Sequence, residues 1–113
     1  MSWQNNRGVF PVLELRPNCE CCDKNLPPNS VEAMICTYEC TFCKSCVEEV
    51  LSNVCPNCGG GFCPRPVRPR LARREGVGIR FQPASQKRVL SRYSKKEMQD
   101  FAVSVKGVAP QER

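Results

Sequence analysis

The chain has 113 residues, a net charge of +6, ten cysteines and no histidine, which suits one small domain with tails. Without histidine no Ser-His or Cys-His catalytic pair can form, and no glycine-rich P-loop pattern occurs, so we expect no enzyme. No run of about 18 apolar residues could span a membrane, and residues 1–10 lack the apolar stretch of a signal peptide. We therefore expect a cytoplasmic protein that makes no membrane contact.

The predicted elements of the first half are short. Alternation of Leu13 and Leu15 with charged residues indicates a short strand, and another brief strand is expected within residues 31–38. In residues 44–51 three apolar side chains recur at helical spacing, which predicts a short helix that Asn53 can end.

The second half differs in composition. Residues 65–70 alternate proline with arginine, which favours an extended, charge-repelled segment, and residues 77–81 show a weak strand pattern. Ser94 and Glu97 form a capping box that predicts a helix start. The helix has one apolar stripe, which indicates a docking face for its own domain or a second copy: Met98, Phe101, Ala102 and Val105.

These patterns divide the chain into five segments. They are a flexible leader (1–12), a two-zinc domain (13–66), a basic Pro/Arg-rich linker (67–92), an amphipathic helix (93–107) and a tail (108–113).

Charge is distributed unevenly between the two halves. Residues 1–63 carry four Lys/Arg and seven Asp/Glu, whereas residues 64–113 carry thirteen and four. The basic clusters at 65–74 and 87–96 could neutralise phosphates of a nucleic acid, with Tyr93 or Phe81 available to stack on a base. Alternatively, the basic tail is only a solvated surface, or it folds back on the acidic head.

Eight cysteines form four closely spaced pairs: Cys19/Cys22, Cys36/Cys40, Cys43/Cys46 and Cys55/Cys58. Two thiolates separated by two to four residues can bind one zinc ion from a tight turn, with Zn–S distances of about 2.3 Å. Disulfides are the alternative, but they belong to an oxidising compartment that we do not expect here. We predict two zinc ions that substitute for a hydrophobic core, because so short a segment buries little apolar surface.

The four pairs can be wired sequentially or as a cross-brace. In sequential wiring the first two pairs share one zinc; in a cross-brace the first and third pairs share one, and the second and fourth share the other. Only Thr41 and Phe42 separate Cys40 from Cys43, so these cysteines can scarcely belong to two distant lobes. The spacing therefore favours the cross-brace.

The cysteine order, with Cys-Thr-Phe-Cys at 40–43 and Cys-Pro-Asn-Cys at 55–58, resembles the RING family of cross-brace zinc domains. That resemblance implies a small metal-stabilised α+β fold with short strands, one short helix and two Zn(Cys)₄ sites, followed here by a basic tail with a C-terminal helix. It implies two ligand sets: Cys19, Cys22, Cys43 and Cys46 for the first zinc, and Cys36, Cys40, Cys55 and Cys58 for the second.

RING domains that recruit ubiquitin-conjugating enzymes often carry an apolar residue in the first pair and a basic residue after the last. Glu20 and Cys21 lie inside the first pair here, and Gly59 follows the last, so we do not expect ubiquitin-ligase activity. The runs LELRPNCECCDK, ECTFC and CPNCGG more closely resemble a bacterial cysteine-rich domain family of unknown function. That resemblance supports the fold, implies a bacterial cytoplasm and brings no activity.

Two cysteines remain outside the pairs. Cys21 could replace Cys19 or Cys22 as a ligand, or act as a reactive thiol beside zinc, and Cys63 is expected to be a free thiol. Closed four-thiolate sites are structural, since catalytic zinc keeps an open position. We therefore predict a structural-zinc module that binds a protein partner. The alternatives are a nucleic-acid-associated zinc protein acting through its basic tail and a zinc-linked thiol redox sensor.

Overall fold

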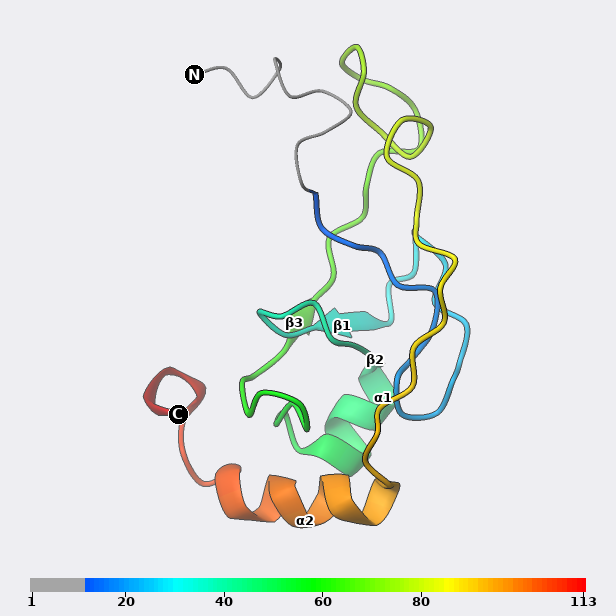
Figure 1. The fold of residues 1–113 in the computed structure, drawn as a ribbon. Helices are drawn as coiled ribbons and strands as arrows, with labels where there is room; N and C mark the ends of the chain where they lie inside the picture. The colour runs from blue at the N-terminus through cyan, green and yellow to red at the C-terminus, as the bar shows by residue number, and fades with distance from the viewer. Residues whose placement is uncertain (1–11) are drawn as a thin grey trace.

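The structure is a computed structural model that describes residues 12–113, so the predicted leader lies outside it except for Val12. In chain order the elements are β1 (Ala33–Ile35), β2 (Thr41–Cys43), α1 (Lys44–Cys46), the π-helical segment η2 (Val47–Leu51), β3 (Cys63–Pro64), α2 (Lys95–Val105) and the 3-10 turn η3 (Pro110–Glu112). Figure 1 shows α1 and η2 between the sheet and α2. This is the small α+β architecture that the sequence predicts.

The three strands form one antiparallel sheet in the order β2-β1-β3. Ala33 lies opposite Cys43, and Ile35 lies opposite Thr41. Cys43 ends β2, and α1 begins at the next residue. Phe42 in β2 is completely buried and meets the edge of Phe62, with 5.4 Å between the ring centroids. The sheet is thus held by one aromatic pair and by the segments that carry the cysteines.

The helix predicted over 44–51 is present as α1 continued by η2. Val47, Val50 and Leu51 are buried, whereas Glu48 and Glu49 are exposed, as the apolar stripe requires. The helix ends at Ser52 and Asn53, whose backbone is left-handed, with φ of 50° and 60°. This ending fixes the start of the segment that leads to the last cysteine pair.

Two predicted strands are absent from the described residues. The segment around Leu15 is extended and Leu15 is buried, but the neighbours that its backbone meets are not strands. The Leu15 carbonyl accepts from the Ser85 N–H, and the Glu14 N–H donates to the Glu39 carboxylate. The pattern at 77–81 forms turns instead, because Gly78, with φ of 138°, reverses the chain.

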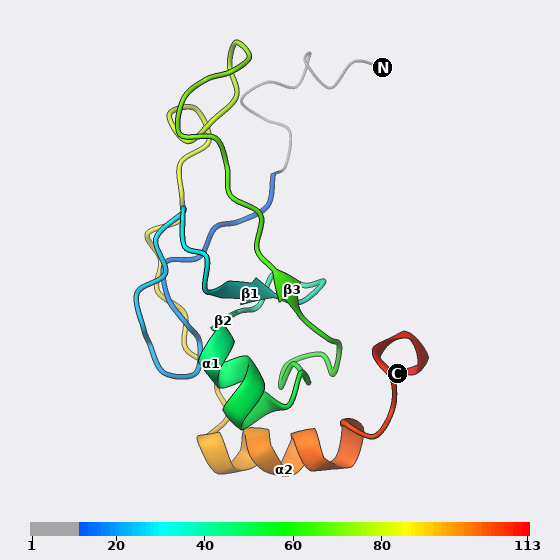
Figure 2. The ribbon, with the colours of Figure 1, turned by 180° about the vertical axis from the view of Figure 1, so that it is seen from behind.

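The basic tail folds back on the cysteine-rich half, which is one of the alternatives that the sequence left open, and Arg65 in the Pro/Arg run predicted to be unpacked is buried. In Figures 1 and 2 the tail runs back beside the first described residues. Asn18, which is fully buried, donates to the Val89 carbonyl at 2.8 Å and accepts from the Val89 N–H at 3.1 Å. The Ser91 N–H donates to the Glu20 carbonyl. These backbone contacts offset the mutual repulsion of the tail's cations.

Arg65 is the most buried of these cations, at 4% exposure. Its guanidinium donates to the carbonyls of Arg16 at 2.8 Å and Pro27 at 2.9 Å, although its buried Nε has no partner among the described residues. Arg68 similarly donates to the carbonyls of Leu13 and Gln82. The sequence could not show that two arginines of the Pro/Arg run are structural.

Helix α2 docks on its own domain. Met98 and Ala102 are buried, Met98 joins the core formed with η2 and the cysteines, and Phe101 and Val103 remain exposed. The Glu97 N–H donates to Ser94 Oγ at 3.1 Å, and the Glu97 carboxylate accepts from the Ser94 N–H at 2.8 Å, so the predicted capping box is present. Within the described chain, no helix combines the length and apolarity needed to cross a membrane.

Replacing Ser94 with alanine should destabilise the protein by about 1 kcal/mol, because the Glu97 N–H loses the Ser94 Oγ acceptor, whereas the contact of the residue 94 N–H with the Glu97 carboxylate is kept. The urea midpoint of the metal-loaded protein measures this change. Gln99→Ala, on the exposed side of the same helix, is the control and should leave the midpoint nearly unchanged. Equal midpoints for both variants would contradict the prediction.

Candidate metal centre

The first sulfur cluster consists of Cys19, Cys22, Cys43 and Cys46, whose Sγ atoms all lie within 4.8 Å of one another. A tight turn presents the first two, β2 ends at the third, and α1 carries the fourth. The Sγ atoms of Cys22 and Cys43 are 3.8 Å apart. Tetrahedral zinc with Zn–S distances of about 2.3 Å separates its sulfurs by about 3.8 Å, so the spacing fits such an ion.

The second cluster brings together Cys36, Cys40 and Cys55, all buried and within the same distance of one another. The eighth predicted ligand, Cys58, is exposed and lies outside this group. Its sulfur accepts from the Gly60 N–H at 3.4 Å, in a loop closed by the Cys55 N–H on the Gly60 carbonyl at 2.8 Å. Three of four predicted ligands thus meet, and the fourth is on an adjoining turn.

The two clusters interleave along the chain. Cys40 immediately precedes β2 and belongs to the second cluster, whereas Cys43 ends β2 and belongs to the first. The first and third cysteine pairs therefore meet, and so do the second pair and Cys55. This is the spatial grouping that distinguishes a cross-brace from two sequential lobes.

The donor chemistry also suits a soft metal ion. All ten cysteines are free thiols, and a separation of 3.8 Å is far beyond an S–S bond of about 2.05 Å. Backbone N–H groups of Cys21 and Cys22 point at Cys19 Sγ, at 3.4 and 3.5 Å, and that of Tyr38 points at Cys36 Sγ at 3.3 Å. Such donors favour the thiolate, which is the form that binds metal.

The thiols of the two clusters have displaced pKa values. Burial raises the pKa of Cys19 and of Cys36 to about 11. Hydrogen bonding from the Cys55 thiol lowers the pKa of Cys40 to about 5, while the pKa of Cys55 is raised by the same contact. The contact between the two thiols thus lowers the pKa of one and raises that of the other, and a metal ion at the cluster can take the place of the shared proton.

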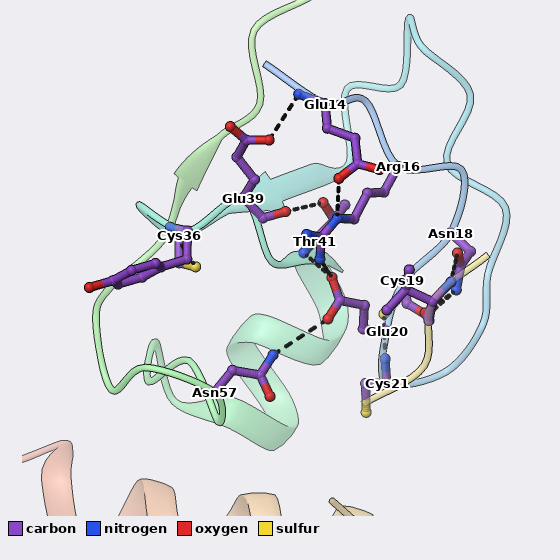
Figure 3. Close-up of polar contacts among 12 residues, drawn as sticks. Glu14, Arg16, Asn18, Cys19, Glu20, Cys21, Cys36, Glu39, Thr41 and Asn57 are labelled. Carbon is purple, nitrogen blue, oxygen red and sulfur yellow. Dashed lines mark hydrogen bonds and ion pairs between the residues drawn. The ribbon is translucent and has the colours of Figure 1, made fainter. Parts of the chain in front are cut away.

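A buried carboxylate lies between the segments that carry the two clusters, and Figure 3 shows its contacts with Thr41 and Asn57. Glu20, inside the first cysteine pair, is 3% exposed and accepts from the Thr41 N–H at 2.7 Å and Arg16 at 2.8 Å. It also accepts from Asn57, inside the last pair, at 3.4 Å. Burial raises the pKa of Glu20, and the Thr41 N–H and Arg16 act in the opposite direction.

Sequence reasoning did not assign Glu20 a role. Its one sequence signal is a charged residue at the position inside the first pair where many RING domains have an apolar one. The structure shows that its carboxylate contacts the segment between Cys40 and Cys43 as well as the last pair.

The two unpaired cysteines lie in different surroundings. Cys21 is half-buried against the first cluster, but that cluster contains Cys19 and Cys22 and does not contain Cys21. Burial raises the pKa of Cys21, which decreases its thiolate fraction. Cys63 is exposed on β3.

Comparison with known proteins places this arrangement in a family. Residues 12–68 match the family described as protein of unknown function (DUF1272). An uncharacterized protein of Rhizobium meliloti (strain 1021) is 56% identical over 79 residues, which make up 70% of this chain and 87% of that protein. The chain belongs to the DUF1272 family. No solved structure matches it.

The DUF1272 match includes both sulfur clusters and all three strands, and it ends before α2. It agrees with the resemblance seen in the cysteine-containing runs of the sequence. Because the family is one of unknown function, a role must be inferred from the chemistry of the clusters and the surfaces around them.

Proposed function

We propose that this protein is a structural-zinc interaction module of RING-like cross-brace form. The observation that supports this most strongly is the four-sulfur cluster of Cys19, Cys22, Cys43 and Cys46, with a sulfur separation suited to tetrahedral zinc. The second ion binds Cys36, Cys40 and Cys55, and Cys58 completes this site by a local movement of its exposed turn.

The proposed role of zinc is structural, and the protein is not an enzyme. Four thiolates around each ion leave no position for water or substrate, as in other structural zinc sites. The ions stabilise a fold whose sheet has only two- and three-residue strands. The redox alternative would use Cys21, which is half-buried beside the first cluster but is not one of its four sulfurs.

We propose a protein as the partner of this module. Phe101, Val103 and Val108 expose apolar side chains on α2 and just after it. A hollow of about 450 Å³ beside Phe101 is bordered by Pro56 and Tyr93. An aromatic side chain beside a hollow, next to a metal-fixed turn, is suited to contact with an apolar side chain of another protein.

Native mass spectrometry of the full chain tests the metal proposal. The protein purified with zinc should carry two ions, and removal of both with a chelator should abolish the far-ultraviolet circular dichroism of the native state. Zinc added back should restore both signals. A mass deficit from disulfides, or a folded protein without metal, would overturn the proposal.

A further inference from the structure

The basic tail contains two structurally different kinds of arginine. Arg65 and Arg68 donate to backbone carbonyls, and Arg88 donates to Asp23 at 2.8 Å and Asn25 at 2.7 Å. These three side chains hold the tail on the cysteine-rich half. They are therefore poor candidates for contact with a partner.

A second set of arginines is concentrated in residues 69–82, which we call the arginine loop. Four of its side chains are exposed, and none forms a hydrogen bond or ion pair with any residue of 12–113: Arg70, Arg73, Arg74 and Arg80. Glu75 is the one acidic residue in this stretch. The loop thus has a net charge of +3, and its arginine side chains are free of hydrogen-bond and ion-pair partners in the described structure.

The arginine loop is closed by its own contacts. The Ile79 N–H donates to the Pro69 carbonyl at 2.9 Å, and the Gln82 side chain accepts from the Gly78 N–H and donates to the Gly76 carbonyl. Gly78 has φ of 138°, and a Cβ there would lie 3.1 Å from the Pro69 oxygen, so this turn requires glycine. A preformed loop loses less conformational entropy when it binds a ligand.

The loop also presents an aromatic ring beside its cations. Phe81 is 47% exposed, and the Arg80 guanidinium lies 5.8 Å from its ring centroid. In both ribbon views the loop projects at the end of the molecule opposite α2. Cations that can contact phosphates, next to a ring on which bases can stack, are the usual elements of single-stranded nucleic-acid binding.

We propose that the arginine loop binds single-stranded nucleic acid. An acidic peptide would use the same arginines, but it would leave the exposed face of Phe81 without a planar partner, so the ring favours nucleic acid. This surface goes beyond the proposed structural-zinc function and is separate from the apolar surface at α2.

Fluorescence anisotropy with a labelled 20-nucleotide RNA strand, measured on the zinc-loaded full chain from 50 to 300 mM salt, tests this proposal. We expect log affinity to fall linearly with log salt, by a slope of about −0.7 for each phosphate contacted. Exchanging the four free arginines for glutamine should weaken binding and flatten the slope by up to about 3. Phe81→Leu should lower affinity for the strand by about tenfold and change the slope little.

The control removes the same charge elsewhere, by exchanging four exposed lysines for glutamine: Lys44, Lys95, Lys96 and Lys106. This variant should keep the salt slope of the unaltered protein. If both quadruple variants lose the same RNA affinity, the binding depends only on net charge, and the proposal is overturned. An absence of binding at 50 mM salt would also overturn it, as would binding of labelled polyglutamate that depends on the four arginines as strongly as RNA binding does.

Native mass spectrometry of each variant separates this proposal from that of structural zinc. The arginine variants should keep two zinc ions while losing RNA. If the quadruple variant loses metal, Phe81→Leu remains decisive, because a folded Phe81→Leu protein with undiminished RNA affinity contradicts stacking. A protein that stays folded and binds RNA without any metal would instead contradict the metal proposal alone.

Discussion

Replacing Cys43 with serine should remove one zinc ion and most of the protein's stability, whereas replacing Cys40 should remove the other ion. Cys40 immediately precedes β2 and Cys43 ends it, and the two belong to different sulfur clusters. Zinc binding to small zinc-finger peptides is worth about 10–16 kcal/mol, which is comparable to the whole stability of a typical domain. Native mass spectrometry and urea unfolding at saturating zinc measure both effects.

Double variants distinguish the cross-brace from sequential wiring. Cys19→Ser combined with Cys43→Ser removes two ligands of one cluster, so one ion should remain at saturating zinc. Cys19→Ser combined with Cys40→Ser affects both clusters and should leave none. Sequential wiring predicts the reverse outcome for the two pairs. Cys63→Ser, at an exposed position outside both clusters, is the control and should retain two ions.

Glu20→Ala should cost about 3–5 kcal/mol, because it removes one partner of a largely buried ion pair. The change leaves the Thr41 N–H without its acceptor and Arg16 without its more buried carboxylate. Glu20→Gln keeps an acceptor oxygen for Thr41 and should cost less. Shifts in the urea midpoint of the zinc-loaded protein measure the difference between these variants.

Glu14→Ala is the matched control for Glu20, since Glu14 also pairs with Arg16 but has a side chain that is 40% exposed. Exposed ion pairs contribute about 0–1 kcal/mol, so this variant should be nearly as stable as the unaltered protein. If Glu14→Ala and Glu20→Ala shift the midpoint equally, the connection through Glu20 is unimportant to stability.

Local signals were sufficient to predict several features. The cysteine pairs, the apolar spacing over 44–51 and the capping residues at Ser94 and Glu97 each act within about one turn of chain. The near-adjacency of Cys40 and Cys43 also favoured the interleaved grouping that the structure has. Interactions between residues that are close in the sequence leave a recognisable residue pattern.

Other features depend on partners far away in the chain. Nothing near Arg65 indicates that carbonyls 38 and 49 residues earlier will accept its hydrogen bonds. Alternation at Leu13 and Leu15 predicted a strand that is not there. Alternation reports only that one side of a segment is buried, and not that the segment pairs with another strand. Pair spacing likewise placed Cys58 beside Cys55 in sequence, but it could not determine which way the Cys58 side chain points.

The contact between Asn18 and Val89 has a consequence for how the protein is made. The two residues are 71 positions apart, so at about 5–20 residues per second a ribosome adds Val89 about 4–14 seconds after Asn18. All eight paired cysteines are synthesised before residue 59. A nascent chain therefore has its thiols available for metal before the segment that covers Asn18 exists, and metal loading can precede closure of the fold.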